Sequence, residues 1–193
     1  MAEPRILVFA GSTRSDSANK KLARLAASEA EAAGGKVTLI DLHELPMPLY
    51  DGDLEAASGI PAEGRRFKAL LKEHQGLIIA SPEYNSSITG VLKNAIDWAS
   101  RPEPGEPPLI AFKQKVALIM SASPGNLGGL RGLVHLRSIL GNIEVLVLPE
   151  QIAISNAYES FAEDGSLKNP RQAETVRKMT QRLVDVVRQL HVS

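Results

Sequence analysis

The chain has 193 residues, no cysteine, and 22 basic and 22 acidic side chains, so its formal net charge is +0. The length predicts one domain over residues 1–193 with a sizeable core. The neutral balance and the 4% aromatic content argue against a nucleic-acid-binding surface, and the lack of cysteine excludes disulfides and thiolate chemistry. No signal peptide or membrane span is visible, so we expect a cytoplasmic protein that needs no membrane.

Short apolar runs alternate with amphipathic segments along the chain. The apolar runs 6–10, 37–40, 77–80, 116–120 and 145–148 predict five buried parallel strands. Helical spacing predicts helices after the polar turn 11–19, over about 61–74, from 88 to 98, over about 127–140, and from Asn169-Pro170 onward. Asn85, Ser86 and Ser87 are candidate caps of the third of these helices. The alternation predicts an α/β protein with a doubly wound parallel sheet, whose strand order the periodicity leaves open between the dinucleotide-binding and flavodoxin-like arrangements.

The loop after the first strand, residues 11–19, combines hydroxyls, the guanidinium of Arg14 and the amino terminus of a helix. These groups suit a phosphate monoester. The loop lacks the Gly-x-Gly-x-x-Gly spacing of a dinucleotide turn and the Gly-Lys-Ser/Thr ending of a nucleoside-triphosphate loop. The alternative interpretation is an ordinary polar turn in which Asp16 or Ser17 caps the helix.

Two further loops follow the third and fourth strands. Pro82–Asn85 presents Tyr84, whose flat face suits a ring, and residues 121–129 carry glycines that let the backbone approach a neighbour closely. Each loop alone is also explained as an ordinary turn. Because all three loops follow the carboxyl ends of predicted parallel strands, we expect them to line one crevice, where open α/β sheets bind ligands.

In this order the motifs resemble the NAD(P)H-dependent FMN reductases of flavodoxin-like fold, a family that includes bacterial quinone, chromate and azo-dye reductases. The resemblance covers most of the chain, from the first strand to the fifth. It rests on Gly11-Ser12-Thr13-Arg14 with Ser17 and Asn19, on Pro82-Glu83-Tyr84-Asn85-Ser86, on the run Leu92 to Trp98, and on Ser123-Pro124-Gly125 with Gly128, Gly129 and Arg131. It implies a five-stranded sheet of order 2-1-3-4-5.

The resemblance also implies a bound FMN, with NADPH or NADH as co-substrate and a small molecule as electron acceptor. That acceptor would be a quinone, an azo compound, a metal oxyanion or free flavin, and no side chain is implied to be catalytic. The FMN phosphate would be held by Ser12, Arg14, Ser17 and Asn19, with Asp16 as a repulsive neighbour. The isoalloxazine ring would be bordered by Pro82, Glu83, Tyr84 and Asn85, and its other edge closed by Ser123 and Gly125.

The predicted helix over 127–140 is apolar on more than one stripe, so it needs a partner besides the sheet. The family forms dimers and tetramers, so we expect a homo-oligomer with a cleft shared between subunits and Tyr50-Asp51 on its rim. Lys93 and Asp97 stand four residues apart and predict an exposed ion pair, and Trp98 is expected to serve in packing or at an interface rather than to stack on a ring. The four histidines lie in unrelated segments, so we expect no metal site.

Three other functions compete with this interpretation. A non-enzymatic flavodoxin-like electron carrier is usually strongly acidic, whereas this chain is neutral. A receiver-type signalling domain needs acidic residues after the first strand and an aspartate ending the third, but these positions hold Gly11-Ser12-Thr13 and Ser81-Pro82. A flavin-free scaffold would make the three loops coincidental.

Overall fold

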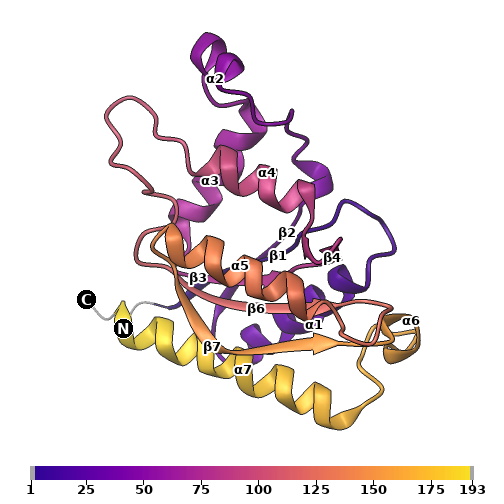
Figure 1. Cartoon of the computed structure of the whole chain (residues 1–193). Coiled ribbons are helices and arrows are strands. Elements are labelled where there is room, and N and C mark those ends of the chain that lie inside the picture. Colours follow the sequence, from indigo (N-terminus) through magenta and orange to yellow (C-terminus); the bar gives the residue numbers. More distant parts are fainter. Residues whose placement is uncertain (1–2, 192–193) are drawn as a thin grey trace.

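The computed structural model describes residues 3–191, in which five parallel strands form one sheet with helices on both faces (Figure 1). The elements follow in chain order: β1 (Arg5–Ala10), α1 (Ala18–Ala32), β2 (Lys36–Asp41), the 3-10 turn η1 (Leu42–Glu44), α2 (Gly52–Ser58), α3 (Ala62–Glu73), β3 (Gly76–Ala80), the short strands β4 (Glu83–Tyr84) and β5 (Ser87–Ile88), α4 (Gly90–Ala99), β6 (Val116–Ala122), α5 (Leu130–Asn142), β7 (Leu146–Ile154), α6 (Ala157–Ser160) and α7 (Pro170–Leu190).

The strand order is β2-β1-β3-β6-β7, with every neighbouring pair parallel. In chain order this is 2-1-3-4-5, so the flavodoxin-like arrangement is confirmed and the dinucleotide-binding one is excluded. The chain leaves β1 and β3, which are neighbours, toward opposite faces, because α1 packs in one core and α4 in the other. A crevice therefore opens between their carboxyl ends, at the topological switch point.

Alternate residues of each central strand enter two separate cores, since successive side chains of a strand point to opposite faces. Ile6 and Val8 of β1 pack with α1 and α7, whereas Leu7 and Phe9 pack with α3, α4 and α5. All four side chains are buried. This burial on both faces explains why the central strands are continuous apolar runs in the sequence.

Several boundaries differ from the predicted ones. The short helices α2 and α6 and the hairpin β4–β5 were not predicted, because two to seven residues are too few for a periodic pattern. β7 continues to Ile154, past Pro149 and Glu150, which interrupt its apolar run. α5 begins at Leu130 rather than at 127, since the residues before it form a glycine turn, and it ends at Asn142.

A hydrogen bond and ion pairs from two lysines of α3 hold the proline-rich segment 101–108 against that helix. The buried Lys68 Nζ donates to the carbonyl oxygen of Arg101 at 2.7 Å and forms an ion pair with Glu106. Lys72 Nζ lies 2.6 Å from the other carboxylate oxygen of Glu106. These two lysines lower the pKa of Glu106 to about 2. The segment is therefore an ordered part of the domain rather than a linker.

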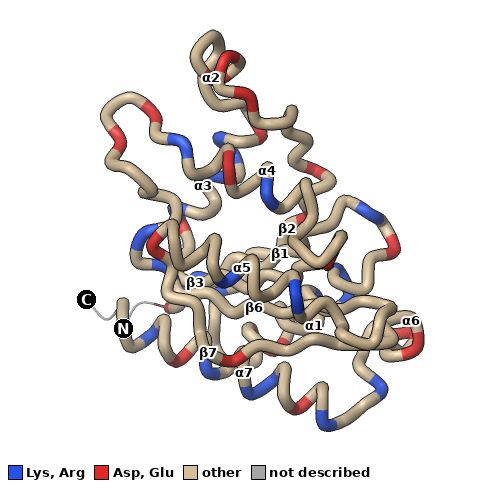
Figure 2. The backbone as a smooth tube through the Cα atoms, viewed as in Figure 1, with Lys and Arg blue, Asp and Glu red and all other residues tan. Residues whose placement is uncertain are grey.

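Charges of both signs are intermixed along the whole backbone (Figure 2), in keeping with the net charge of +0. Between residues 3 and 191, no helix is both long enough and apolar enough to cross a membrane. Over the same residues, no group of three or more histidine, aspartate or glutamate side chains is placed to hold a metal ion.

Candidate functional site

The three loops meet at the carboxyl edge of the sheet, where they line one open cleft. Residues 157 and 158, from the segment after β7, complete its walls. Asn85 and Gly125 belong to the same loops but do not line the cleft. The other eight predicted site residues do: Ser12, Arg14, Ser17, Asn19, Pro82, Glu83, Tyr84 and Ser123.

The first loop presents hydrogen-bond donors to the cleft that remain available to a ligand. Ser17 is the N-cap residue of α1, yet its side chain makes no bond to the helix. Ser12 Oγ accepts a hydrogen bond from the Arg14 amide at 3.2 Å and so keeps its own proton to donate. Both serines are buried, the Arg14 side chain is exposed, and all three residues line the cleft. Together with the free amides of the first turn of α1, this set fits a phosphate monoester.

Asp16 lies beside these donors, and Lys21 offsets its charge. Lys21 Nζ is 3.0 Å from Asp16 Oδ1, and the hydrogen bond from Lys21 lowers the pKa of Asp16. Both side chains are exposed, so the pair contributes little to stability. It does reduce the repulsion that Asp16 would exert on a bound phosphate.

Asn19 holds two of the loops together. Its Nδ2 donates to the carbonyl oxygen of Ala122 at 2.7 Å, and its Oδ1 accepts from the Ala122 amide at 2.9 Å. The side chain is 3% exposed. These bonds tie the first turn of α1 to the end of β6, so the main role visible for Asn19 is structural. A direct contact between Asn19 and a phosphate stays a prediction.

The second loop is a hairpin rather than a simple turn. β4 and β5 pair antiparallel, and Asn85 and Ser86 between them have left-handed backbones with φ of 50° and 66°. Two such residues make the tight turn that best fits the twist of paired strands. Asn85 is therefore placed at the turn itself, outside the set of residues that line the cleft.

The predicted cap of α4 is wrong. Neither Asn85, Ser86 nor Ser87 caps this helix, because the hairpin uses them; the cap is Thr89, whose Oγ1 accepts from the Leu92 amide at 3.2 Å. The Thr89 hydroxyl donates to the carbonyl oxygen of residue 11 at 2.6 Å. Thr89 thus sets the second loop against the first.

Glu83 anchors the hairpin to α5. Its carboxylate accepts from Arg131 Nε at 2.9 Å and from the Gly132 amide at 3.0 Å. Burial opposes ionisation, but the hydrogen bonds from Gly132 and Arg131 outweigh it and lower the pKa of Glu83. Because this carboxylate is occupied, Glu83 can border a ring only through its backbone. Tyr84 beside it is 57% exposed and keeps an aromatic face free.

The glycines of the third loop mainly serve the fold. A Cβ on Gly128 (φ +61°) would lie 2.7 Å from the backbone of Ile154, and one on Gly129 (φ +93°) would lie 1.9 Å from Ser121 Oγ. The close approach predicted for these glycines is thus an approach to β6 and β7. Gly125 differs, since a Cβ there would meet no atom closer than 4.0 Å.

Two residues that shape the cleft escaped the sequence analysis, Thr89 and Tyr158. Thr89 carried a detectable signal, a threonine directly before a helical pattern, but the earlier polar residues masked it. Tyr158 carried none, because only the fold brings the segment after β7 next to the first loop. Tyr158 lines the cleft beside Arg14, and hydrogen bonding with Tyr158 is the main cause that raises the pKa of Arg14.

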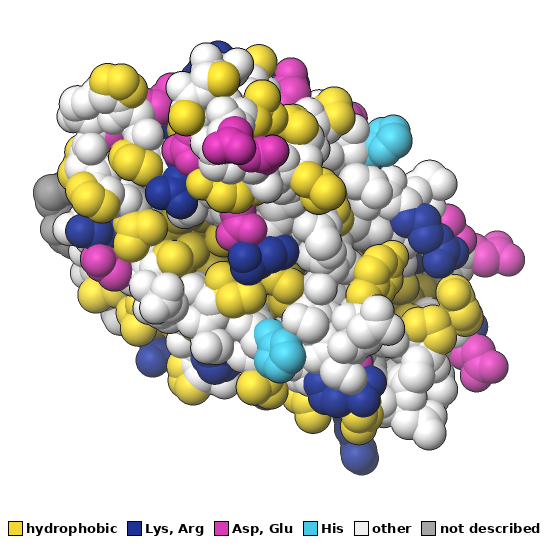
Figure 3. Space-filling view, turned by 45° about the horizontal axis from the view of Figure 1, so that its top comes forward, with side chains coloured by type: hydrophobic (Ala, Val, Ile, Leu, Met, Phe, Trp, Pro, Cys, Tyr) yellow, Lys and Arg dark blue, Asp and Glu magenta, His cyan; other side chains and the backbone are white. Residues whose placement is uncertain are grey.

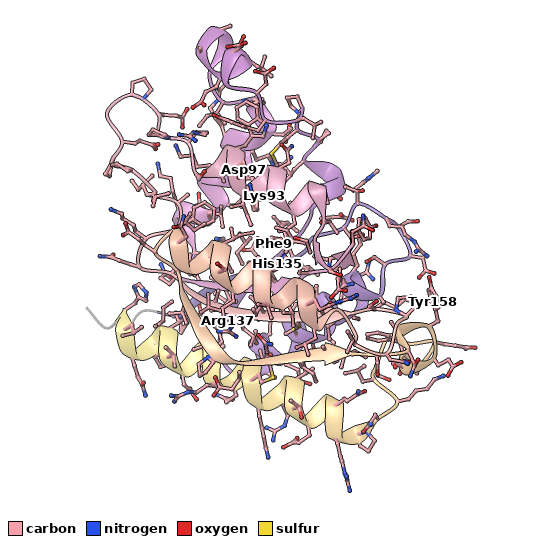
Figure 4. All side chains as sticks on the ribbon, viewed as in Figure 1. Phe9, Lys93, Asp97, His135, Arg137 and Tyr158 are labelled. Carbon is pink, nitrogen blue, oxygen red and sulfur yellow. The ribbon has the colours of Figure 1, made fainter. Side chains whose placement is uncertain are left out.

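Lys93, Asp97 and Trp98 lie outside the cleft. Lys93 Nζ is 2.8 Å from Asp97 Oδ1, which confirms the predicted ion pair, and Figure 4 shows both side chains on α4. Trp98 is buried, donates from Nε1 to the carbonyl oxygen of Pro48 at 2.8 Å, and packs edge-to-face on Tyr50. The expected packing role of Trp98 is confirmed.

The model of the NADPH-dependent FMN reductase family matches residues 4–159 of the chain. The chain belongs to this family. The reductase is 37% identical over 187 residues to a NAD(P)H-dependent FMN reductase of Pseudomonas aeruginosa, covering 96% of both chains. It is 35% identical over 148 residues to the quinone reductase of Escherichia coli K12, covering 75% of this chain and 73% of the relative. Among solved structures it is similar to FerB, a flavoenzyme NAD(P)H:(acceptor) oxidoreductase from Paracoccus denitrificans, with a TM-score of 0.81, 30% identity, and coverage of 96% and 98%.

Family membership confirms the class of enzyme and its cofactors. The chain is an oxidoreductase that uses FMN as its flavin and a reduced nicotinamide nucleotide as its reductant. The donor set of Ser12, Arg14 and Ser17 at the amino terminus of α1 fits the phosphate of FMN, and the exposed ring of Tyr84 fits a planar isoalloxazine. The cleft, located from geometry alone, therefore suits the cofactor that the family uses.

Proposed function

We propose that this reductase works by a two-step exchange at one face of FMN bound in the cleft. When bound, FMN would supply the hydride-accepting and two-electron-donating chemistry, with NADPH or NADH as reductant and the acceptor entering after the nucleotide leaves. The residues of the chain bind and orient the cofactor. We assign the phosphate to Ser12, Arg14, Ser17 and Asn19 and nominate no side chain as a catalytic acid or base.

One observation carries this proposal. Three loops from distant parts of the sequence converge on one cleft, and they bring to it side-chain groups that are still free to bind a ligand. The hydroxyls of Ser12 and Ser17 have protons to donate, the Arg14 guanidinium is exposed, and Tyr84 has a free face. Groups that only closed turns would be bonded to the chain itself, as the Glu83 carboxylate is.

The ring of FMN is assigned to the second and third loops. The backbone of Pro82–Asn85 would border one edge, and Ser123 and Gly125 the other. Two backbone hydrogen bonds hold Ser123 in place. The Ser123 amide donates to the carbonyl oxygen of Ile154 at 3.0 Å, and the Ala157 amide donates to the carbonyl oxygen of Ser123 at 3.1 Å. Its side chain is therefore presented from a fixed backbone.

We propose a small two-electron acceptor as the second substrate, of the class of quinones, azo compounds, metal oxyanions or free flavin. The relatives named as quinone reductases support the quinone among these. NADPH and NADH are supplied by metabolism in the cytoplasm, where we place the reaction.

We propose further that the active form is a homo-oligomer, a dimer or a tetramer, with the cleft shared between subunits. Leu127, Leu130 and Val134, at and before α5, are exposed apolar residues. Figure 3 shows hydrophobic side chains spread among charged ones over the face that includes α4 and α5. A self-complementary two-fold contact would cover such a face.

We propose that an arm of the molecule contributes to the shared cleft. The segment that carries α2 projects from the body (Figure 1), and α4 holds its base. Asn94 accepts from the Tyr50 amide at 2.8 Å and donates to the carbonyl oxygen of Pro48 at 2.8 Å. Leu49 between them is 81% exposed. An apolar side chain held outward in this way suits contact with a second copy, with Tyr50-Asp51 at the rim of its cleft.

The direct test is a visible spectrum of the purified protein with one equivalent of FMN, recorded anaerobically before and after NADPH or NADH. We expect a flavin spectrum perturbed by binding that bleaches on addition of nucleotide and recovers when benzoquinone is added. A perturbed spectrum that neither nucleotide bleaches would indicate an electron carrier instead. A spectrum identical to that of free FMN, with no bleaching, would remove the proposal.

The oligomer is tested separately by sedimentation velocity at micromolar concentration. Val134→Asp places a charge on the exposed face of α5 without touching a core, so it should dissociate the assembly and lower the rate of acceptor reduction. A wild-type protein that sediments as a monomer with full activity would contradict the shared cleft.

A further inference from the structure

Tyr158 stands at the phosphate end of the cleft and takes little part in packing. Its side chain is 71% exposed and lines the cleft together with Ser12, Arg14 and Ser17. Figure 4 shows Tyr158 at the edge of the molecule, at α6, on the side where the loop after β1 lies. Since no core packs on this ring, its hydroxyl is free for a ligand and its replacement should not unfold the protein.

The backbone beneath Tyr158 is fixed. The Ala157 amide donates to the carbonyl oxygen of Ser123 at 3.1 Å, which joins α6 to the third loop of the cleft. Ser160 Oγ donates to the carbonyl oxygen of Ser155 at 2.8 Å and closes α6 onto the end of β7. An exposed side chain on so constrained a backbone can reach only a small region, and that region borders the cleft that Arg14 also lines.

The chemistry of Arg14 and Tyr158, which line the same cleft, leaves the phenol hydrogen unused. A guanidinium has donors only, so where Arg14 meets Tyr158 in the cleft that both line, Arg14 can only donate and the phenol oxygen can only accept. The phenol hydrogen therefore remains available, and the adjoining cation strengthens it as a donor. The hydroxyls of Ser12 and Ser17 are donors in the same cleft. An anion between them would be met from two sides.

We propose that Tyr158 is a cofactor-binding residue whose hydroxyl donates to the phosphate of FMN and, with Arg14, closes the phosphate end of the cleft. The proposal rests on the proposed function, because it takes FMN as the ligand. Tyr158 then discriminates FMN from flavins without a phosphate and lengthens the time that FMN stays bound. It has no part in hydride transfer, since the ring is assigned to the other two loops.

The experiment compares FMN with riboflavin, which has the same ring and no phosphate. Dissociation constants of both flavins are measured by quenching of flavin fluorescence in flavin-free wild type and in Tyr158→Phe, which loses the hydroxyl and keeps the ring. The dissociation rate of FMN is measured by dilution into excess acceptor apoprotein. Tyr84→Phe is the matched control, because it removes the same hydroxyl from the exposed tyrosine of the ring-side loop.

Tyr158→Phe should bind FMN roughly tenfold more weakly and release it faster, with riboflavin affinity unchanged within about twofold. Tyr84→Phe should leave the ratio of the two affinities at its wild-type value. Equal FMN affinity in Tyr158→Phe and wild type, or an equal loss for both flavins, would overturn the assignment of Tyr158. In either case a wild type that still prefers FMN to riboflavin keeps the proposed function. A wild type that binds FMN no better than riboflavin would instead refute the phosphate site itself.

Discussion

Replacing Asn19 by alanine should destabilise the protein even when no flavin is present. The Asn19 side chain makes two hydrogen bonds, of 2.7 Å and 2.9 Å, to the carbonyl and amide of Ala122, and it is 3% exposed. Each buried backbone group that loses its partner costs about 1–3 kcal/mol. Water from the adjoining cleft can replace part of this bonding, so we expect the free energy of unfolding to fall by about 2–4 kcal/mol.

Asn19→Asp is the matched control, because it keeps the shape of the side chain. The new carboxylate can still accept from the Ala122 amide, but when ionised it cannot donate to the Ala122 carbonyl oxygen. Protonation restores the donor, so the pKa of the new carboxyl group should be raised in the folded state. The deficit relative to wild type should therefore be largest at neutral pH and shrink as the pH falls toward about 4.

The assay is urea unfolding of the flavin-free proteins, followed by circular dichroism at pH 7 and at pH 4, with FMN affinity measured afterwards. Suppose flavin-free Asn19→Ala matches wild type within about 0.5 kcal/mol while FMN affinity collapses. That outcome would show that Asn19 serves the phosphate directly and that its bonds to Ala122 contribute little, which would refute the structural reasoning.

Two further predictions concern the loops around the cleft, and a third concerns the segment 101–108. Gly129→Ala should lower the free energy of unfolding, measured in urea, by about 2–4 kcal/mol, because a left-handed backbone is strained with a Cβ and that Cβ would clash with Ser121 Oγ. Adding Ser121→Ala should recover part of this loss. A double variant with no recovery would mean that backbone strain alone causes the loss. Glu83→Gln should lower the free energy of unfolding by about 1 kcal/mol, because its hydrogen bond to Arg131 is weakened. The affinity for FMN should stay within about threefold of wild type. A larger loss of FMN affinity would place the carboxylate against the flavin ring. Glu106→Gln should be less stable than wild type above pH 4.5, and the difference should vanish as the pH falls toward 2, because paired lysines lower the pKa of Glu106 to about 2; a deficit in melting temperature that persists at low pH would contradict this.

The parts of the fold that could be predicted are those whose residues interact with near neighbours in the sequence. The five strands were readable because burial on both faces demands uninterrupted apolar runs such as Ile6–Ala10. The last helix was readable because Asn169 and Pro170 are a local start signal, and Asn169 does cap it by accepting from the Arg171 amide at 3.0 Å. The hairpin at Asn85 and Ser86 was missed because polar turn residues also resemble helix caps, and only strand pairing distinguishes the two.

The sequence by itself determined the five strands and the three loops that follow them, since each depends on neighbours within a few positions, and its motifs pointed to the family. The tertiary structure alone decided what each loop residue is used for. It bonds the Asn19 side chain to Ala122, 103 positions away, and the Glu83 carboxylate to α5. The hydroxyl hydrogens of Ser12 and Ser17, by contrast, stay available to a ligand. It also brought Tyr158 to Arg14. Hydrogen bonds between distant segments leave no periodic trace in the sequence, because each needs only one suitable residue at each end.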